Sequence, residues 1–540
     1  MKLRNFANKF LLLIALVLVL SCSFTLGTTP VNLRIVTAEA EETAATALTK
    51  TYLYDQLNWN KPSDTPETIY DALGIKTYNN YLMELSQTQE LNEVIVAVVD
   101  SGVDRTQSVF DDRLLSDYAM DFSRGLPSAG TNTWYVDENG HGTHVSGIIA
   151  DATLANVKIL PVKIFYGTSN ESNNYYYSFL NALRYLYALK TGKKVSLVNN
   201  VGVESATYGY YFNPEEVQLD NLVVVNMSLG TEGLTKEELE NKYSAQRKVY
   251  QEMIDYYLLQ NNILPIVAAG NRETEKEKEL DENGELKPYY SIPGACSGVL
   301  AVAAYDNRNQ EYALADFSYY NDNISIAAPG AEIWSACTNK ISAIKTKLDI
   351  KEDGIYYAYD TLEWKKDLYG NYYYKSSGTS MATPFVTACY AMLMSDYSKT
   401  QAADFGLTSW NHDDVESSDH QYLTMAHKAL LAAAATNGVG TAGYSEKFGY
   451  GTLTVACFVP EHGTTTIEPL NEIEYEPVVN TTKDTAQEPP VVVLKTSTQV
   501  NWFLVCVILA VGIVAIWLIK IFRDYCAAMI RRKEEANDEQ

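Results

Sequence analysis

The sequence predicts a doubly wound α/β fold, with helices on both faces of a mostly parallel sheet, and a C-terminal transmembrane helix after it. The first observation is a set of continuous apolar runs, because strands buried on both faces lack polar alternation. They cover residues 94–99, 157–162, 222–226, 263–269 and 299–304. The second is that helical patterns fall between these runs, as parallel strands require crossover connections. The third is an uncharged apolar run near the C-terminus, residues 502–519, which is long enough to cross a bilayer.

The N-terminus has the form of a secretory signal. Basic residues precede the apolar run Phe10–Leu20, which is too short for a comfortable membrane span. Two cleavage points stay open: Leu20-Ser21-Cys22 loosely resembles a lipoprotein site, and Ala38-Glu39-Ala40 has the small-x-small form. Residues 1–40 are therefore assigned to a signal region.

The segment of residues 41–90 is expected to be an N-terminal extension that packs on the main domain, because it holds aromatic residues such as Trp59 and Tyr70. The main α/β domain then covers residues 91–460. The whole chain is 46% hydrophobic and 20% charged, which favours a globular protein over a disordered one.

Helices are expected between and after the strands. The first of them presents Phe179, Leu183 and Leu186 on one face. The others are expected at residues 237–259, 385–394 and 424–436.

A turn at Ser377-Gly378-Thr379-Ser380 leads into the apolar helix and presents a hydroxyl at its N-terminus. Thr379 and Ser380 suit an N-cap, and Pro384 lies near the helix start, where its missing N–H costs little. The free amides and the positive dipole end favour negative charge, which a hydroxyl attacking a carbonyl generates. Ser380 is therefore a candidate nucleophile, with helix capping as its alternative role.

Two further stretches complete a set with this turn. Asp100 ends the first apolar run and begins Asp100-Ser101-Gly102-Val103-Asp104, and His141 lies in Asn139-Gly140-His141-Gly142-Thr143-His144. In the order Asp, His, Ser, the three stretches resemble the subtilisin-like serine proteases, the subtilases. The resemblance covers roughly residues 60–457 and implies a serine endopeptidase that works through an acyl-enzyme and needs no cofactor for catalysis.

The resemblance also implies roles for four residues. Ser380 is the nucleophile, His141 is the general base and then the general acid, and Asp100 fixes the imidazole tautomer. Asn271 follows a buried run and matches the asparagine that donates to the oxyanion, together with the Ser380 N–H. A turn former is the alternative reading of Asn271.

Two neighbouring residues are interpreted as structural. Asp104 is expected to stabilise a turn, as Asp side chains often do. His144 lies one helical turn beyond His141, and no nearby Glu pattern supports a zinc pair.

Substrate binding is assigned, again by resemblance, to Ser228, Leu229 and Gly230. In the family this segment pairs with an extended peptide and forms one wall of the primary side-chain pocket. Three segments depart from the family and are interpreted as insertions: residues 195–220, 272–290 and 340–375. Two roles stay open for them, narrowing of substrate access and decorative surface loops.

Charge and composition exclude several other functions. A net charge of −25 weighs against a nucleic-acid partner, which would favour a basic surface. The scattered cysteines form neither a disulfide framework nor a zinc pattern. Structural calcium is common in the family and Asp111 and Asp112 lie near an expected ligand, but no calcium site is assigned.

The C-terminal part predicts membrane attachment. Residues 461–500 are acidic and contain several prolines, as a tether would, and residues 501–522 form the transmembrane helix. The basic residues in the tail of residues 523–540 place that tail in the cytoplasm and the main domain outside the cell. We therefore expect a single-pass cell-membrane protein whose polypeptide substrate is exported or close to the membrane.

Few residues precede Asp100 compared with subtilases that carry a separate folded propeptide. This layout resembles the mycosins, subtilases with an N-terminal extension and a C-terminal membrane helix, and it implies secretion machinery as a partner. A membrane-anchored extracellular endopeptidase is the leading hypothesis. The alternatives are a secretion-associated scaffold, a processing enzyme similar to lantibiotic leader peptidases, and an inactive subtilase-like binding protein.

Overall fold

The structure is a computed structural model that describes residues 66–126, 132–166, 175–199, 207–212, 217–306, 313–338, 364–366, 371–396, 430–431, 434 and 444–459. Residues 203–207 and 492–540 form a separate unit, of which only Thr207 is described. No helix within the described ranges is long and apolar enough to cross a membrane. The predicted signal region, tether and transmembrane helix, and most of the helix predicted at residues 424–436, lie outside those ranges.

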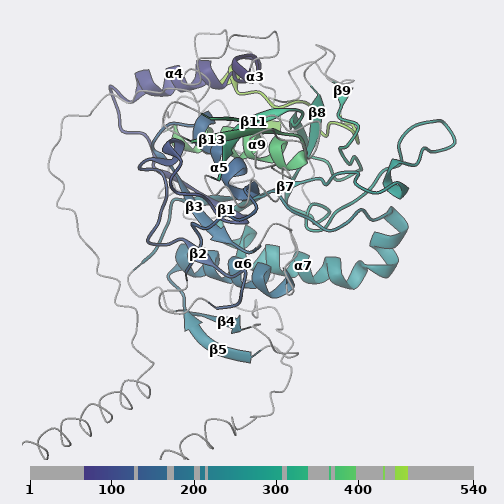
Figure 1. Cartoon of the computed structure of the whole chain (residues 1–540), viewed down its shortest axis with the longest axis horizontal. Coiled ribbons are helices and arrows are strands. Elements are labelled where there is room, and N and C mark those ends of the chain that lie inside the picture. Colours follow the sequence, from purple (N-terminus) through teal and green to yellow (C-terminus); the bar gives the residue numbers. More distant parts are fainter. Residues whose placement is uncertain are drawn as a thin grey trace, which may run out of the picture. The chain divides into compact units, whose positions relative to one another are not determined.

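An eight-stranded sheet forms the centre of the described part of the chain (Figure 1). Its strands are β1 Val94–Asp100, β2 Met120–Asp121, β3 Val157–Lys163, β6 Leu222–Met227, β7 Leu264–Ala268, β8 Leu300–Asp306, β9 Ala313–Leu314 and β10 Ile326–Pro329. They lie in the order β10-β8-β7-β6-β1-β3-β2, with β9 also paired to β8. Every pairing is parallel except that of β8 with β9. The predicted mostly parallel sheet is confirmed.

The apolar runs form strands because both faces of the sheet are covered. Every residue of β1 is buried, as is every residue of β6 and β7. All five runs predicted as strands become strands, with ends that shift by one or two residues.

The strand order explains where reactive groups can gather. From β1 the chain continues to β3 on one side and later returns to β6 on the other side. In open α/β sheets ligands bind at such a reversal, outside the carboxyl ends of the strands. Asp100 ends β1 and Ser228 follows β6, so both lie at this edge.

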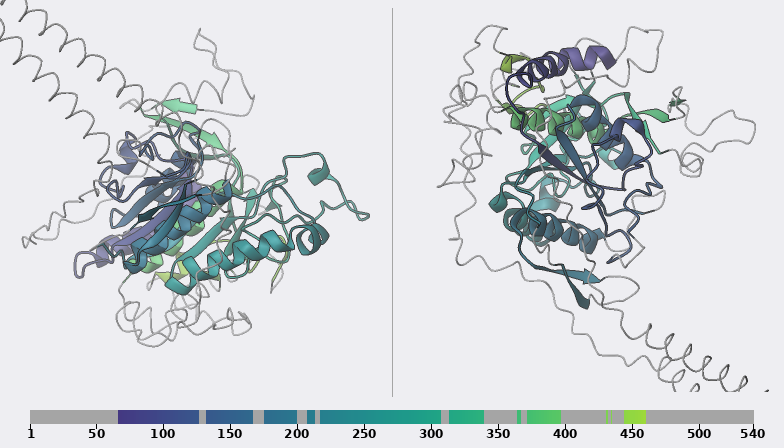
Figure 2. Two further views of the ribbon diagram at one scale, coloured as in Figure 1. Left: turned by 90° about the horizontal axis from the view of Figure 1, so that it is seen from below. Right: turned by 90° about the vertical axis from the view of Figure 1, so that its left-hand side faces the viewer.

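Helices cover the sheet on both faces, as Figures 1 and 2 show. Helix α5, His141–Ala152, and α9, Thr379–Ser395, pack together on one face. On the other face lie α6, Tyr175–Thr191, and α7, Ser244–Tyr257. This arrangement confirms the predicted helices on both faces.

Two helix predictions need correction. The helix expected at residues 237–259 is divided: a π-helical turn at Glu238–Lys242 ends at Tyr243, whose φ of −109° and ψ of 8° are not helical, and α7 begins after it. The helix after Ser377 begins directly at Thr379, and Gly378, with a φ of +156°, is its N-cap residue, so neither Thr379 nor Ser380 is the N-cap. Pro384 therefore lies inside α9 and not at its first turn.

Smaller elements surround this core. Helices α3 (Pro66–Ala72) and α4 (Ile75–Leu85) precede β1, and Asn79 Nδ2 donates to the Ala152 carbonyl at the end of α5 at 2.8 Å. The segment interpreted as an insertion at residues 195–220 forms a small sheet of β4 Val195–Asn199 and β5 Thr207–Phe212. The segment at residues 340–375 contributes β12 Trp364–Lys366 and most of β13 Tyr372–Ser376, which pairs with β11 Ile333–Cys337 just before that segment. Short 3-10 turns lie at Ser108–Phe110, Leu259–Asn261, Lys276–Lys278 and Ala456–Phe458.

Candidate active site

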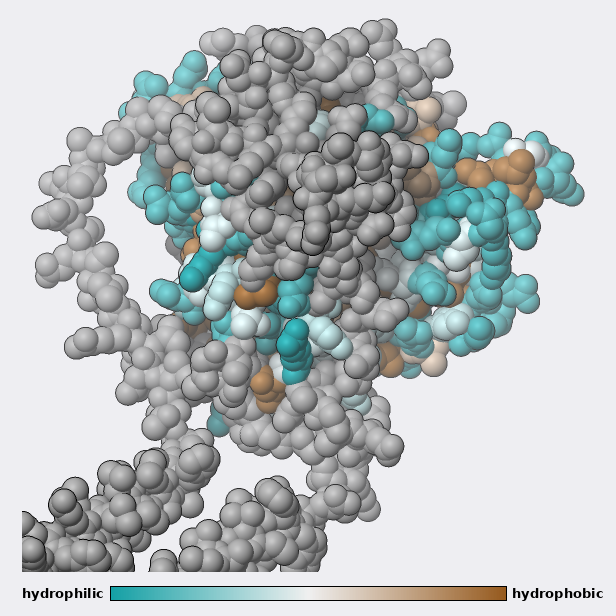
Figure 3. Space-filling view, viewed as in Figure 1, coloured by the Kyte–Doolittle hydropathy of each residue, from teal (hydrophilic) through white to brown (hydrophobic). Residues whose placement is uncertain are grey.

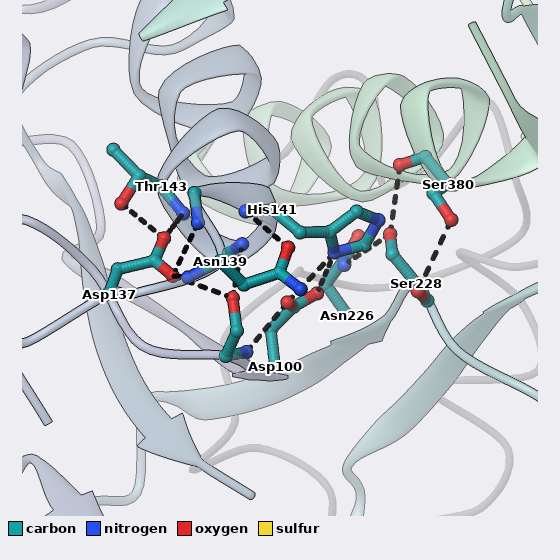
Figure 4. Close-up of polar contacts among 11 residues, drawn as sticks. Asp100, Asp137, Asn139, His141, Thr143, Asn226, Ser228 and Ser380 are labelled. Atoms are coloured by element: carbon teal, nitrogen blue, oxygen red, sulfur yellow. Dashed lines mark hydrogen bonds and ion pairs between the residues drawn. The ribbon is translucent and has the colours of Figure 1, made fainter. Parts of the chain in front are cut away.

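Asp100 and His141 form a hydrogen-bonded pair at the edge of the sheet. His141 is the first residue of α5, and its Nδ1 lies 2.8 Å from Asp100 Oδ1 and 3.0 Å from Oδ2 (Figure 4). The carboxylate also accepts the backbone N–H of Ser101 at 2.7 Å and is only 1% exposed. A carboxylate can only accept here, so Nδ1 carries the proton and Nε2 is left as the acceptor.

A second carboxylate, Asp137, holds the loop that places this pair. Its Oδ1 accepts the Ser101 hydroxyl at 2.9 Å and the backbone N–H groups of Asn139 and Gly140 at 3.1 and 2.7 Å. Its Oδ2 accepts the N–H and the hydroxyl of Thr143 at 2.9 and 2.6 Å. Complete burial raises the pKa of Asp137, although the hydrogen bonds from Thr143 and Gly140 act in the opposite direction. Asp137 thus ties the end of β1 to the start of α5.

Asp104 and His144, the two residues interpreted as structural, both make contacts that fit a structural role. Asp104 Oδ1 accepts the N–H and the hydroxyl of Thr106 at 3.0 and 2.7 Å, which confirms the predicted turn. His144 is fully buried, and its Nε2 lies 3.1 Å from the carbonyl oxygens of Ile333 and Tyr374. These contacts support a structural role for His144.

Ser380 is the second residue of α9 and is paired with Ser228 after β6. Ser380 Oγ donates to the Ser228 carbonyl at 3.3 Å, and Ser228 Oγ donates to the Ser380 carbonyl at 2.9 Å. The Ser380 carbonyl is available because Pro384, four residues later, has no N–H to donate to it. Asn226 Nδ2 donates to Ser228 Oγ at 3.0 Å and so orients the Ser228 hydroxyl. Pro384 thus leaves the Ser380 carbonyl open to the hydrogen bond that links α9 to the predicted substrate segment.

The imidazole lies beside the serine pair that contains the candidate nucleophile. Both His141 and Ser380 are partly exposed, and Figure 4 shows the His141 ring between Asp100 and the pair of serines. These two described residues share no hydrogen bond in this structure, since Ser380 Oγ donates to Ser228 instead. A hydroxyl that rotates about one bond can exchange these partners, and such contacts are often long without substrate.

Asn271 is oriented by the start of α9. Its Oδ1 accepts the backbone N–H of Thr379 at 2.9 Å and the Thr379 hydroxyl at 3.1 Å. The accepted N–H identifies this atom as the amide oxygen, so Nδ2 is the free end of the side chain. Gly270 makes the turn that brings Asn271 here, with a φ of +107°. The Ser380 N–H lies in the first turn of α9, where amides lack helical acceptors. Two donors therefore flank the candidate nucleophile.

A pocket of about 170 Å³ opens beside the imidazole. It is lined by His141, Phe165, Tyr175 and residues 228–231. The rings of Phe165 and Tyr175 stack with centroids 5.6 Å apart. The predicted substrate residues Ser228, Leu229 and Gly230 are thus brought next to His141, along one wall of an aromatic pocket.

The segment after Asn271 forms a charged arm, residues 273–287, which is the mostly hydrophilic projection at the right of Figure 3. Glu277 anchors it: the carboxylate accepts the N–H groups of Glu273, Thr274 and Gly233 at 2.9, 2.8 and 3.0 Å, and the Tyr319 hydroxyl. Burial by itself raises the pKa of Glu277, but these hydrogen bonds outweigh it and lower the pKa to about 2. The anchor ties the arm to the segment that follows Gly230.

We expect Glu277→Gln to loosen this arm in a pH-dependent way. A carboxyl whose pKa falls from 4.5 to about 2 on folding stabilises the protein above pH 4.5, and this contribution is lost as the pH falls towards 2. The variant should therefore have a lower free energy of unfolding than the wild type at pH 7, and the difference should shrink below pH 4.5. Urea unfolding of both proteins across this range measures it.

Glu279→Gln is the matched control for this prediction. Glu279 lies on the same arm but is exposed and pairs only with Lys287 Nζ, at 3.0 Å, among its recorded ion pairs. Surface pairs of this kind contribute about 0–1 kcal/mol. An equal loss of stability in the two variants, or a loss in Glu277→Gln that does not change with pH, would contradict the anchoring role.

Metal sites and disulfides contribute nothing to this arrangement in the part of the chain that is described. No cluster of His, Cys, Asp or Glu there could hold a metal ion, and no calcium ligand is assigned to Asp111 or Asp112. The described residues Cys296, Cys389 and Cys457 are free thiols.

The sequence model of the subtilase family matches residues 92–451. Fervidolysin of Fervidobacterium pennivorans is 27% identical over 357 residues, which are 62% of this chain and 41% of that protein. Minor extracellular protease Epr of Bacillus subtilis is 25% identical over 364 residues, 66% of this chain and 37% of that protein. The chain thus spans about two fifths of the length of these curated relatives.

Among solved structures, the chain is similar to that of a lanthipeptide protease, with a TM-score of 0.44 and 19% identity. The match covers 72% of this chain and 93% of that one.

Proposed function

Because the chain belongs to the subtilase family, we propose that it is a serine endopeptidase in which Asp100, His141 and Ser380 act as one unit. The observation that carries the proposal is the Asp100–His141 pair at 2.8 Å, whose imidazole ring lies between Asp100 and the pair of Ser228 and Ser380. Neither the Asp100–His141 pair nor Ser380 would indicate a protease by itself. Their convergence with Asn271 at one edge of the sheet fits acyl transfer.

The reaction begins when Ser380 Oγ bonds to the substrate carbonyl carbon and its proton moves to His141 Nε2. Asp100 holds the imidazole and stabilises the imidazolium. The negative charge on the former carbonyl oxygen is met by Asn271 Nδ2 and the Ser380 N–H. Nε2 then gives its proton to the departing nitrogen, the C–N bond breaks, and an ester on Ser380 is left. Water then bonds to the ester carbonyl carbon while His141 Nε2 takes a proton from it, and Nε2 returns that proton to Ser380 Oγ as the C–O bond to the serine breaks and the acid leaves.

The substrate is proposed to be a polypeptide bound in extended form along Ser228–Gly230. Pairing with this segment uses main-chain hydrogen bonds and leaves selectivity to the pockets. The aromatic pocket at Phe165 and Tyr175 lies on the same wall, so it suits an apolar side chain on the acyl side of the cleaved bond.

Asn271→Ala should lower kcat by about 100- to 1000-fold with a small change in KM, because the oxyanion donor acts mainly in the transition state. That magnitude is the one known for the corresponding residue of subtilisin. Steady-state kinetics with one peptide substrate measure it. Asn323→Ala is the control, because the Asn323 amide donates to the Gly294 carbonyl, away from the nucleophile. A kcat equal to that of the wild type in Asn271→Ala would remove this residue from the mechanism.

The activity itself is tested by labelling the purified full-length protein with a fluorophosphonate and by following cleavage of a denatured protein substrate. Labelling of Ser380, located by mass spectrometry, together with cleavage is expected. A protein that neither reacts with the probe nor cleaves any peptide would overturn the proposal and favour the inactive binding protein.

We also propose that residues 501–522 anchor the protease in the cell membrane with its catalytic domain outside the cell. The support is the sequence alone: the signal region, the apolar run and the basic residues after it. Deletion of residues 501–540 should release the domain from the membrane fraction into the medium. A truncated protein that stays with the membrane or inside the cell would contradict the anchor.

A further inference from the structure

We infer that the primary pocket of this protease is shallow, with Ser291 as its floor, and that it selects a small side chain on the residue that supplies the cleaved carbonyl. This residue is called the acyl residue below, and the small side chains are those of glycine, alanine and serine. The inference rests on the proposed function and deepens it, because it names the substrate class of the same site.

The location of this pocket follows from the site. The cleaved carbonyl must lie between Ser380 Oγ and Asn271 Nδ2, and the peptide before it runs along the wall that ends at Gly230. The side chain of the acyl residue therefore enters the space between Gly230 and the turn at Gly270, which carries Asn271. Gly230 is exposed and Gly270 is partly exposed, so a substrate can reach both sides of this space from solvent.

Ser291 fills the bottom of that space and is only 2% exposed. A Cβ placed on Gly230 would lie 2.1 Å from Ser291 Oγ, and one placed on Gly270 would lie 3.2 Å from Ser291 Cβ. One serine side chain thus touches both walls. The ring of Tyr319 closes the same space from the side of Gly270, where that Cβ would lie 2.4 Å from the ring.

This floor is rigid. Ser291 Oγ donates to the Thr231 carbonyl at 2.8 Å, while the backbone N–H of Ile292 donates to the Thr231 hydroxyl at 3.0 Å and its carbonyl accepts the Thr231 N–H at 2.9 Å. The Tyr319 N–H donates to the Gly270 carbonyl at 3.0 Å, and its hydroxyl donates to Glu277. A large side chain could enter only by breaking these contacts, whereas a methyl or hydroxymethyl group needs no movement.

The experiment uses the full-length protein and a set of quenched fluorescent peptides that differ only at the acyl residue: glycine, alanine, serine, leucine or phenylalanine. For the wild type we expect kcat/KM to be at least about 10-fold higher for the small residues than for leucine and phenylalanine. Ser291→Gly should raise the ratio of kcat/KM for phenylalanine to that for alanine by about 10-fold, because the floor is removed. A ratio between substrates does not depend on how much protein is folded.

Ser297→Gly is the matched control, since Ser297 is exposed and its recorded contact is with Gln251 on α7. Its substrate ratios should equal those of the wild type. Ser291→Ala, which removes only Oγ, is the second variant if Ser291→Gly does not fold, and it should shift the ratio in the same direction by a smaller factor.

Cleavage of the phenylalanine peptide as fast as the alanine peptide by the wild type would overturn the shallow pocket and leave the protease intact. Unchanged ratios in Ser291→Gly would overturn the role of Ser291. Absence of cleavage for every peptide, together with no fluorophosphonate labelling, would instead overturn the proposed function and the inference with it.

Discussion

Replacement of Ser380 by alanine should abolish peptide hydrolysis, with kcat lower by about 10⁶-fold, the magnitude known for the triad serine of subtilisin. The variant keeps every backbone contact of α9 and loses only the hydroxyl that donates to the Ser228 carbonyl. Its melting temperature should therefore stay close to that of the wild type. Peptide cleavage and fluorophosphonate labelling measure the loss of the nucleophile, and thermal unfolding shows that the fold is kept.

The control for this variant is Ser377→Ala. Ser377 belongs to the same turn, but it is exposed, and its hydroxyl only accepts the N–H of Glu332 at 2.8 Å. Its kcat should lie within a few-fold of the wild type. Residual cleavage by a highly purified Ser380→Ala protein at more than a thousandth of the wild-type rate would show that another group is the nucleophile.

Asp100→Asn is expected to lower kcat by about 10⁴-fold. An asparagine fills the same space but can present its amide N–H groups to Nδ1, which favours the wrong imidazole tautomer and leaves no charge to stabilise the imidazolium. Binding uses other groups, so KM should change little. Kinetics with one peptide substrate at several pH values measure the effect.

Asp104→Asn distinguishes the two carboxylates at the end of β1. Asp104 is also buried, but it accepts from Thr106 and Thr338 and makes no recorded contact with His141. Most of the activity should remain in this variant. A larger loss in Asp104→Asn than in Asp100→Asn would reassign the partner of the histidine.

The strands and the positions of Asp100 and His141 could be predicted because each depends on residues that are close together in the sequence. The strands follow from runs that are apolar throughout, because a sheet covered on both faces excludes polar residues from its strands. Asp100 was placed at the end of such a run and His141 at the start of a helix, and the structure brings their side chains into contact.

Contacts between segments far apart in the sequence were missed. Asp137 gave a local signal, because an Asp shortly before Asn139-Gly140 is typical of a turn that caps a helix, yet its bond to Ser101 could not be foreseen. Pro384 was expected to be neutral at a helix start, whereas it frees a carbonyl for Ser228 across 152 residues of sequence. The floor made by Ser291 depends on three loops at once, so no single stretch of sequence reveals it.

The burial of two free thiols, Cys296 and Cys389, determines how they react in reducing and oxidising compartments. Thiol oxidation and alkylation proceed through the thiolate and need access to it. Burial raises the pKa of Cys296 to about 12 and raises that of Cys389 still further, and both side chains are sealed from water. At neutral pH almost no thiolate exists at either sulfur, so oxidants and alkylating reagents find no nucleophile there. Cys296 and Cys389 can therefore stay reduced and unmodified in either a reducing or an oxidising compartment.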